Sequence, residues 1–317
     1  MKNDYSSLTE PVMRDAYFRA DMTTGCRDSD YIPKVANAGD IIVKNGQRLQ
    51  IMHNGVKVVA GGYGGEWMAG IIAKLGGHHE PQEEAVFHEV MKLLPAKATM
   101  IELGGFWSYY SLWFLKQSPA KRKSVVVEPD ARNLAIGQAN AAANKRTIEF
   151  VNASVGAKSL KPRKFTCDDG EIVKVPQVSV PDIMRQFDMP VLDVLHCDIQ
   201  GFETVVLQSC QSLLAAGKIR FCVVSTHTHY ISGDPLTHQR CLKIVKDAGG
   251  QILAEHDVHE SFSGDGLIVA YFGKEPIKWT PPHLSYNRYA TSLFRNPLFD
   301  LDDINQGKIE RAEKTKL

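Results

Sequence analysis

Three short apolar segments of this chain end in acidic residues and a turn, a pattern that can build a binding site. They cover residues 100–105, 125–130 and 194–203, and they contribute the acids Glu102, Glu128 and Asp198. Open α/β sheets place small-molecule sites at the carboxyl ends of their strands, where such side chains meet. Three such ends within about one hundred residues predict an enzyme that binds a nucleoside cofactor.

The first two of these strand ends indicate which nucleoside cofactor binds. Glu128 follows Gly104 by 24 residues, and a carboxylate at this place can accept both ribose hydroxyls of an adenosine moiety. Gly104 and Gly105 let the backbone approach the nucleoside closely, and the helix start at Ser108 offers N–H groups to a carboxylate. A nicotinamide dinucleotide would use the same ribose acid. Glu102 favours S-adenosylmethionine, because a carboxylate beside the glycine turn repels a pyrophosphate and attracts an ammonium or sulfonium.

A further set of polar residues could activate the group that receives a methyl from this cofactor. Residues 223–229 form an apolar strand ending in His227 and His229, which share one face if the strand continues that far. If it lies beside the strand that ends at Asp198, all three side chains meet at the cofactor edge. A histidine that removes the proton of the acceptor hydroxyl can raise the reaction rate by about 10²–10⁴-fold. Alternatively, Mg²⁺ or another divalent cation, held by Asp198 and His229, could lower the pKa of that hydroxyl. The catalytic candidates are His227, His229 and Asp198, and both mechanisms stay open.

Each of these residues also has a purely structural interpretation. His227 and His229 could cap a loop, and Asp198 could be a helix N-cap. We interpret His196 as a core residue, and Asp265 as a turn residue before the last strand.

Hydrophobic periodicity predicts the elements that position these residues. Strands are expected near 99–103, 124–128, 147–151, 191–198, 220–226, 251–256 and 266–272, and helices near 108–117, 130–143, 180–187, 202–215 and 236–248. This alternation predicts an α/β fold with a mostly parallel sheet covered on both faces. The interval 156–177 interrupts it, and Asp168-Asp169-Gly170 predicts an inserted hairpin there.

The N-terminal region follows a different pattern. Residues 1–40 lack periodicity and are expected to form an irregular arm, whereas Asn54-Gly55 predicts a hairpin over 47–62. The glycine-rich loop 61–65 is expected to be flexible. A helix over 80–94, opened by Pro81, follows, and His78-His79-Glu80 before it could reach the cofactor cleft.

Taken in order, these motifs resemble the FkbM-type methyltransferases, a class of S-adenosylmethionine-dependent O-methyltransferases. The resemblance covers residues from about 80 to 272 and rests on 100–105 with Tyr109-Tyr110-Ser111, on 127–129 and on 198–203. The family pattern at the first motif is Asp-x-Gly-Ala-Asn-x-Gly, where this chain has Glu102, Phe106 and Ser108 in place of the Asp, the Asn and the last Gly.

The resemblance implies a Rossmann-like class I methyltransferase fold, with a seven-stranded, mostly parallel sheet and a reversed last strand. It also implies that Asn152, Ala153 and Ser154 lie near the adenine, and that the acceptor is a hydroxyl of a sugar, glycoconjugate or secondary metabolite. We therefore expect an N-terminal extension over 1–80 that could act as a lid, a methyltransferase domain over 81–274 and a C-terminal tail over 275–317.

Composition narrows the class of partner. The 37 basic and 36 acidic residues give a net charge of +1, which offers no electrostatic attraction to nucleic acid. The chain shows no signal-peptide pattern and no membrane-spanning apolar run, and its six spread cysteines are typical of buried free thiols, so we expect a cytoplasmic protein without a membrane partner. A small molecule or glycan is the expected acceptor, and a homo-oligomer is compatible with the sequence. A non-catalytic S-adenosylmethionine-binding module and a nicotinamide-dependent dehydrogenase stay open as alternatives.

Overall fold

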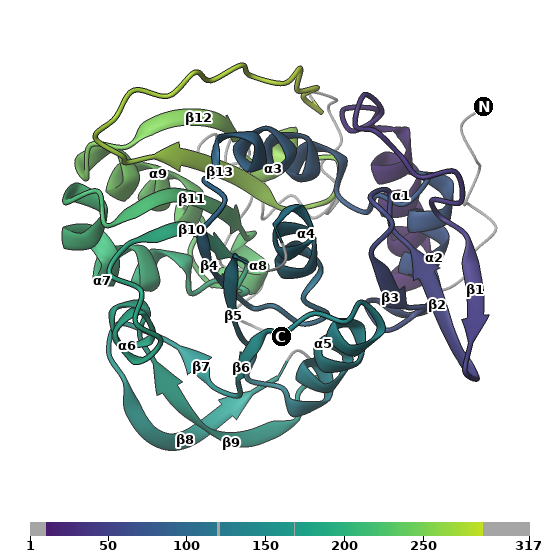
Figure 1. Cartoon of the computed structure of the whole chain (residues 1–317), viewed down its shortest axis with the longest axis horizontal. Helices are drawn as coiled ribbons and strands as arrows, with labels where there is room; N and C mark the ends of the chain where they lie inside the picture. Colours follow the sequence, from purple (N-terminus) through teal and green to yellow (C-terminus); the bar gives the residue numbers. More distant parts are fainter. Residues whose placement is uncertain (1–10, 119–120, 168, 288–317) are drawn as a thin grey trace, which may run out of the picture.

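The computed structural model describes residues 11–118, 121–167 and 169–287 (Figure 1). Its centre is one seven-stranded sheet in the order β12-β13-β11-β10-β4-β5-β6. The strands are β4 (Thr99–Leu103), β5 (Lys123–Val127), β6 (Glu149–Val151), β10 (Leu192–Cys197), β11 (Ile219–Thr226), β12 (Gln251–His256) and β13 (Gly266–Tyr271). Only β13 runs antiparallel to its neighbours in this sheet. The predicted class I fold with a reversed last strand is therefore confirmed.

Helices cover both faces of this sheet, as its strand pattern requires. Successive strand residues point to opposite faces, and Met100 joins a cluster with α3 (Pro81–Leu93), α4 (Tyr109–Gln117) and α5 (Ala131–Ala143). Its neighbour Ile101 joins a second cluster with α6 (Val180–Gln186), α7 (Glu203–Ala215) and α9 (Thr237–Asp247). Because both faces are covered, β10 and β13 are buried along their whole length.

The N-terminal region departs from the expected irregular arm. Over Pro11–Gly25 the chain forms helix α1, so the prediction for 1–40 is wrong there, whereas residues 1–10 lie outside the described residues. Contacts far away in sequence hold α1: the Trp67 indole donates to the Ala16 carbonyl at 2.9 Å, and the Thr23 hydroxyl donates to the Phe262 carbonyl at 2.8 Å. Periodicity missed the helix because tertiary contacts, rather than one apolar stripe, stabilise it.

The N-terminal hairpins were only partly predicted. Strands β2 (Gln47–Ile51) and β3 (Lys57–Val59) pair antiparallel around Asn54-Gly55, as predicted. A second hairpin joins β1 (Ile41–Lys44) to β2 through Asn45 and Gly46, whose φ angles are +50° and +77°. Asn-Gly is the strongest short hairpin signal, and it stood in the sequence at this place as well.

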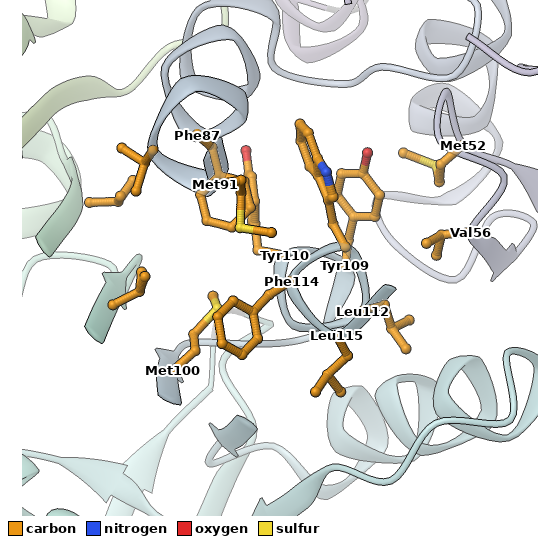
Figure 2. Close-up of a cluster of buried hydrophobic side chains, with 14 of the residues drawn as sticks. Met52, Val56, Phe87, Met91, Met100, Tyr109, Tyr110, Leu112, Phe114 and Leu115 are labelled. Carbon is orange, nitrogen blue, oxygen red and sulfur yellow. The ribbon is translucent and has the colours of Figure 1, made fainter. Parts of the chain in front are cut away.

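The N-terminal region and the sheet share one hydrophobic cluster. Met52, Val56 and Ile71, the last from α2 (Gly65–Lys74), belong to the cluster that contains Phe87 and Phe114. Figure 2 shows Met52 and Val56 beside the α4 residues Tyr109 and Leu112. The expected division at residue 80 stays a prediction, but the described part of the extension is packed against the sheet's helical layer.

The insertion and the tail complete the fold. Strands β8 (Leu160–Thr166) and β9 (Ile172–Val178) form the predicted hairpin, and β7 (Ser154–Val155) joins it in the order β7-β9-β8. Of the tail, residues 275–287 run without a helix or strand, but Trp279 and Leu284 pack on the first cluster. All six cysteines are buried free thiols, as expected. In the described ranges no helix combines the length and the apolar character that crossing a membrane needs.

Candidate active site

A pocket of about 210 Å³ lies at the carboxyl ends of β4, β5 and β10. In the sheet, β4 has β5 on one side and β10 on the other. The chain runs from β4 to β5 and later returns to β10, so the pocket lies where the strand order reverses. Ligands of open α/β sheets bind at such a reversal. Its lining includes Tyr63, Gly104, Phe106, Glu128, Pro129, Asp130, Ser154, Val155, Phe165, Cys167, Asp198, Ile199 and Gln200.

The strand ends around this pocket approach one another so closely that one position must be glycine. Gly104 has φ of +71°, and a Cβ there would lie 1.7 Å from the carbonyl oxygen of Asp198. The Asp198 amide donates to the Leu103 carbonyl at 3.1 Å, which fixes the ends of β4 and β10 together. The glycine turn predicted from the sequence therefore serves close backbone approach.

Glu128 closes the second side of the pocket. Its Oε2 accepts the Phe106 amide at 3.2 Å, and its Oε1 accepts the Asp130 amide at 2.9 Å. The side chain of Asn152 donates to the carbonyls of Glu128 and Pro129, at 3.0 and 2.9 Å. Backbone donors thus hold the Glu128 carboxylate at the edge where a ribose acid was predicted.

The predicted cofactor residues divide into two groups in the structure. Gly104, Glu128, Ser154 and Asp198 line the pocket. Glu102, Gly105, Ser108, Asn152 and Ala153 are outside its lining.

The second group has structural surroundings that the strand-end pattern did not reveal. The Glu102 carboxylate accepts the Ser111 amide at 2.9 Å at the start of α4, and burial raises its pKa. A Cβ on Gly105 would lie 2.4 Å from the Val126 side chain, and Ala153 is fully buried. The Ser108 hydroxyl is buried, and the described residues offer it no hydrogen-bond partner. Their contact with a cofactor stays a prediction.

His227 lies among three carboxylates. Its Nδ1 is 2.8 Å from Glu203 Oε1, and its Nε2 is 3.1 Å from Asp198 Oδ1 and 3.7 Å from Asp265 Oδ1. Burial by itself would lower the pKa of His227, but Asp265, Glu203 and Asp198 outweigh burial and raise the pKa well above its ordinary value. Burial likewise favours a higher pKa for Asp198, yet His227 holds that pKa below its ordinary value. These contacts therefore favour a protonated His227 beside an ionised Asp198.

His229 does not share a face with His227, because β11 ends at Thr226 and the two-residue period of the strand ends with it. His229 begins the short helix α8 (His229–Ser232), is exposed, and lines a second hollow, outside the cofactor pocket, whose lining also includes His227 and His238. In the part of the chain that the structure describes, Asp198 and His229 belong to no group of three metal-ligand side chains. The structure therefore brings His227 to Asp198, whereas the role expected for His229 stays a prediction.

Of three further residues at or near the site, only Asp265 was not predicted to belong to it, because residues 78–80 were expected to reach the cofactor cleft and the aromatic ring of Tyr63 offers a platform for an acceptor. Asp265, interpreted as a turn residue, lies beside His227, and burial raises its pKa to about 6. Tyr63, from the glycine loop, lines the pocket and stacks on Trp107 with ring centroids 4.7 Å apart. Burial, together with Glu83, Asp265 and Asp198, raises the pKa of Glu80 well above its ordinary value. Asp265 directly precedes β13, which pairs antiparallel with β11, so it lies at the carboxyl end of β11. This position in the sequence is the signal that could have identified Asp265 as a site residue.

Comparison with known proteins agrees with this architecture. Residues 96–252 match the model of the methyltransferase FkbM domain. This segment belongs to the FkbM methyltransferase family. The FkbM segment holds Gly104, Glu128, Ser154 and Asp198, whereas Tyr63 and Asp265 lie outside it. No protein of curated function matches the chain in sequence.

Several solved structures are similar to this chain in fold. A precorrin-6y C5,15-methyltransferase from Geobacter metallireducens is 13% identical, with 59% of this chain and 87% of the other covered and a TM-score of 0.38. A SAM-dependent methyltransferase from Aquifex aeolicus is 11% identical, with 60% and 89% covered and a TM-score of 0.38. TrmK of M. capricolum, in complex with S-adenosyl-homocysteine, is 12% identical, with 70% and 82% covered and a TM-score of 0.37.

Proposed function

We propose that this protein is an S-adenosylmethionine-dependent O-methyltransferase whose acceptor is a hydroxyl of a sugar, glycoconjugate or secondary metabolite. The observation that carries the proposal is the carboxylate–histidine cluster that joins the pocket at Asp198, within a methyltransferase-family chain. In-line methyl transfer needs the acceptor oxygen to be aligned and its proton to be removed. A pocket with an ionised cluster at its edge provides for both.

The pocket lining suits this cofactor. Glu128 offers a carboxylate to the ribose, Val155 and Phe165 offer apolar contacts to the adenine, and the Gly104 turn allows close backbone approach. When bound there, the cofactor supplies the electrophilic methyl group.

Asp265 is the residue that we assign to receive the proton of the acceptor hydroxyl. With a pKa of about 6 its carboxyl group is ionised at neutral pH, and a base with a pKa near the working pH is effective. His227 already carries a proton, so its role in the proposal is to orient Asp198 and Asp265 and to offset their charge. His229, exposed in a different hollow, has no part in this version.

Activation by Mg²⁺ or another divalent cation held at Asp198 is the alternative mechanism. Carboxylate oxygens are the ligands that Mg²⁺ prefers. A metal-dependent reaction loses activity in a chelator and recovers with Mg²⁺ or Mn²⁺, whereas a reaction that depends only on Asp265 is insensitive to the chelator.

Calorimetry with S-adenosyl-homocysteine tests the cofactor assignment. Replacement of Glu128 by Ala removes a charged hydrogen-bond partner worth about 1–3 kcal/mol, which corresponds to a Kd about 5–150-fold higher. Glu149→Ala, at an exposed acid that begins β6, is the matched control and should leave the Kd unchanged. Equal affinity of the Glu128 variant and the parent would remove Glu128 from the cofactor site.

Transfer of an isotope-labelled methyl group to candidate glycans and hydroxylated metabolites tests the reaction itself. Mass spectrometry of the product should locate the label on an oxygen. A label found on nitrogen or carbon would overturn O-methylation while leaving methyl transfer intact. Saturable binding of a nicotinamide dinucleotide with no binding of S-adenosyl-homocysteine would contradict the cofactor class.

A further inference from the structure

A second cluster of polar side chains lies outside the pocket, beneath the N-terminal region. It consists of His53 in the turn between β2 and β3, His78 before α3, and Glu84 in α3. Each side chain is at most 1% exposed, and the three donor atoms lie within 4.8 Å of one another. Within the described ranges this is the one group of three possible metal ligands with such spacing.

The two imidazole rings converge on a single carboxylate oxygen. The rings stack with centroids 4.2 Å apart and planes inclined by 15°. Glu84 Oε2 lies 2.5 Å from His78 Nδ1 and 3.5 Å from His53 Nδ1. The Tyr109 hydroxyl oxygen adds a fourth donor atom, 2.9 Å from His53 Nδ1 and 3.5 Å from Glu84 Oε2. Two nitrogens and two oxygens match the ligand number and type of a zinc site, and one of the two stacked rings must turn for both nitrogens to face the same ion.

Two of these four separations are those of ligands that share one ion, whereas the His53–Tyr109 and His78–Glu84 contacts are at hydrogen-bond distance. Zinc binds nitrogen and oxygen at about 2.0–2.2 Å, so tetrahedral ligand atoms lie about 3.3–3.5 Å apart. The Glu84 contacts with His53 and with Tyr109 have this length, at 3.5 Å each. The His78–Glu84 contact is at hydrogen-bond distance, and it opens by about 1 Å when an ion replaces the shared proton.

Backbone and second-layer contacts hold the ligands in place. The His53 amide donates to the Gly77 carbonyl at 2.8 Å, which brings the two histidines together. Gly77 has φ of +90°, and a Cβ there would lie 2.3 Å from the His53 nitrogen, so no larger residue fits. The other oxygen of Glu84 contacts the His79 amide and Nδ1, at 2.8 and 2.6 Å. Such outer contacts orient a carboxylate ligand toward its metal.

We propose that His53, His78 and Glu84, with Tyr109 as the fourth ligand, bind one structural Zn²⁺ that ties the N-terminal region to α3 and α4. None of the four lines the cofactor pocket, and all four are buried. A closed set of four protein ligands leaves no position for a substrate, which is typical of structural zinc rather than catalytic zinc. The site is therefore independent of the proposed reaction.

Metal analysis of the full chain tests this site. Protein produced in zinc-containing medium and purified without chelator or metal-affinity resin should contain about one zinc per chain by mass spectrometry. Removal of the ion by a strong chelator should lower the Tm, and Zn²⁺ should restore it. Replacement by Co²⁺ should give the visible absorption of a four-coordinate site.

Two variants and a matched control connect the ion to these residues. His53→Asn and His78→Gln should each abolish stoichiometric zinc, whereas His256→Asn, at a buried histidine of β12, should retain it. If the variants do not fold, the metal content of the unaltered chain decides. A folded chain that contains no zinc, takes up none and has a Tm unaffected by Zn²⁺ would overturn the proposal and leave a hydrogen-bonded histidine–glutamate cluster.

Discussion

At the scale of single residues, the candidate site depends on charges held together away from water. Asp198, Glu203 and Asp265 surround the fully buried His227, each within 4 Å of a ring nitrogen. A buried carboxylate without a partner is costly, and the contact with His227 holds the pKa of Asp198 below its ordinary value. Asp265 lies farthest from His227, at 3.7 Å, and burial raises its pKa to about 6, which suits a base that works near neutral pH.

Activity should therefore depend on the ionisation of Asp265. The groups that face it are His227, Asp198, Arg19 and Glu83, and its pKa is about 6. A base works only when deprotonated, so kcat/KM should be lost as pH falls through about 6 and should level off above pH 7. Asp265→Asn should lower kcat by about 10²–10⁴-fold and remove this slope.

An exposed acid on α9 provides the control for this experiment. Asp247→Asn should keep both the rate and the pH profile. Full activity of Asp265→Asn, or a rate in the unaltered chain that does not change between pH 5 and 7, would assign the proton to another group.

At the scale of elements, the inserted hairpin becomes part of the pocket. Phe165 at the end of β8 and Cys167 after it line the cavity beside Pro129 and Asp130, which precede α5. Arg132 ties the hairpin tip to α5, because its guanidinium lies 2.7 Å from Asp169 and 2.9 Å from Glu171. An element outside the common sheet thus supplies one wall of the proposed adenosine site.

Loosening this connection should weaken cofactor binding slightly. The Arg132 side chain is 54% exposed, and water and salt screen exposed ion pairs, so Arg132→Ala should raise the Kd for S-adenosyl-homocysteine by at most about 5-fold. High salt should weaken binding to the unaltered chain and have less effect on the variant. Arg185→Ala, whose partner Asp182 lies in α6 away from the pocket, should bind normally. If the Arg132→Ala variant and the unaltered chain have the same Kd at low salt, the ion pairs of Arg132 do not contribute to cofactor binding.

At the scale of the whole molecule, the N-terminal region is part of the main core. A single cluster of buried side chains runs from Met52 and Ile71 through Phe87 to Met100 in the central sheet. Deletion of residues 1–75 would therefore remove part of this core. Such a deletion is expected to destabilise the protein, so it is not a clean test of whether the N-terminal region acts as a lid. Tyr63 remains the point at which this region contacts the pocket.

A core that is shared in this way should unfold as one unit. Ile71→Ala removes a buried side chain of α2 and should lower the free energy of unfolding by about 2–5 kcal/mol in a single cooperative transition. Val43→Ala is the control: the Val43 side chain is 73% exposed, and this variant should change the free energy of unfolding by less than about 0.5 kcal/mol. An early separate transition confined to the N-terminal region, seen by denaturation or hydrogen exchange, would contradict this expectation.

The sequence by itself determined the alternation of strands and helices from residue 99 to residue 271. Apolar runs, glycine turns and helix starts are local signals, and they place Glu128 after β5 and Asp198 after β10 within a residue or two. The parallel order then follows, because crossover connections allow few arrangements. Because ligands of open α/β sheets bind at the carboxyl ends of the strands, the strand order also predicts the position of the pocket.

Tertiary structure decided what local signals do not contain. The helix α1 depends on contacts with residues more than two hundred positions away, and His53 meets Glu84 only because Gly77 admits the backbone of the hairpin turn. Packing of the strand ends likewise brings Asp265 to His227, and β11 gives way to the short helix α8 before His229. Ionisable side chains that are far apart in the sequence have their pKa values set by burial and by the charges beside them in the folded chain. A local sequence pattern contains no information about those distances.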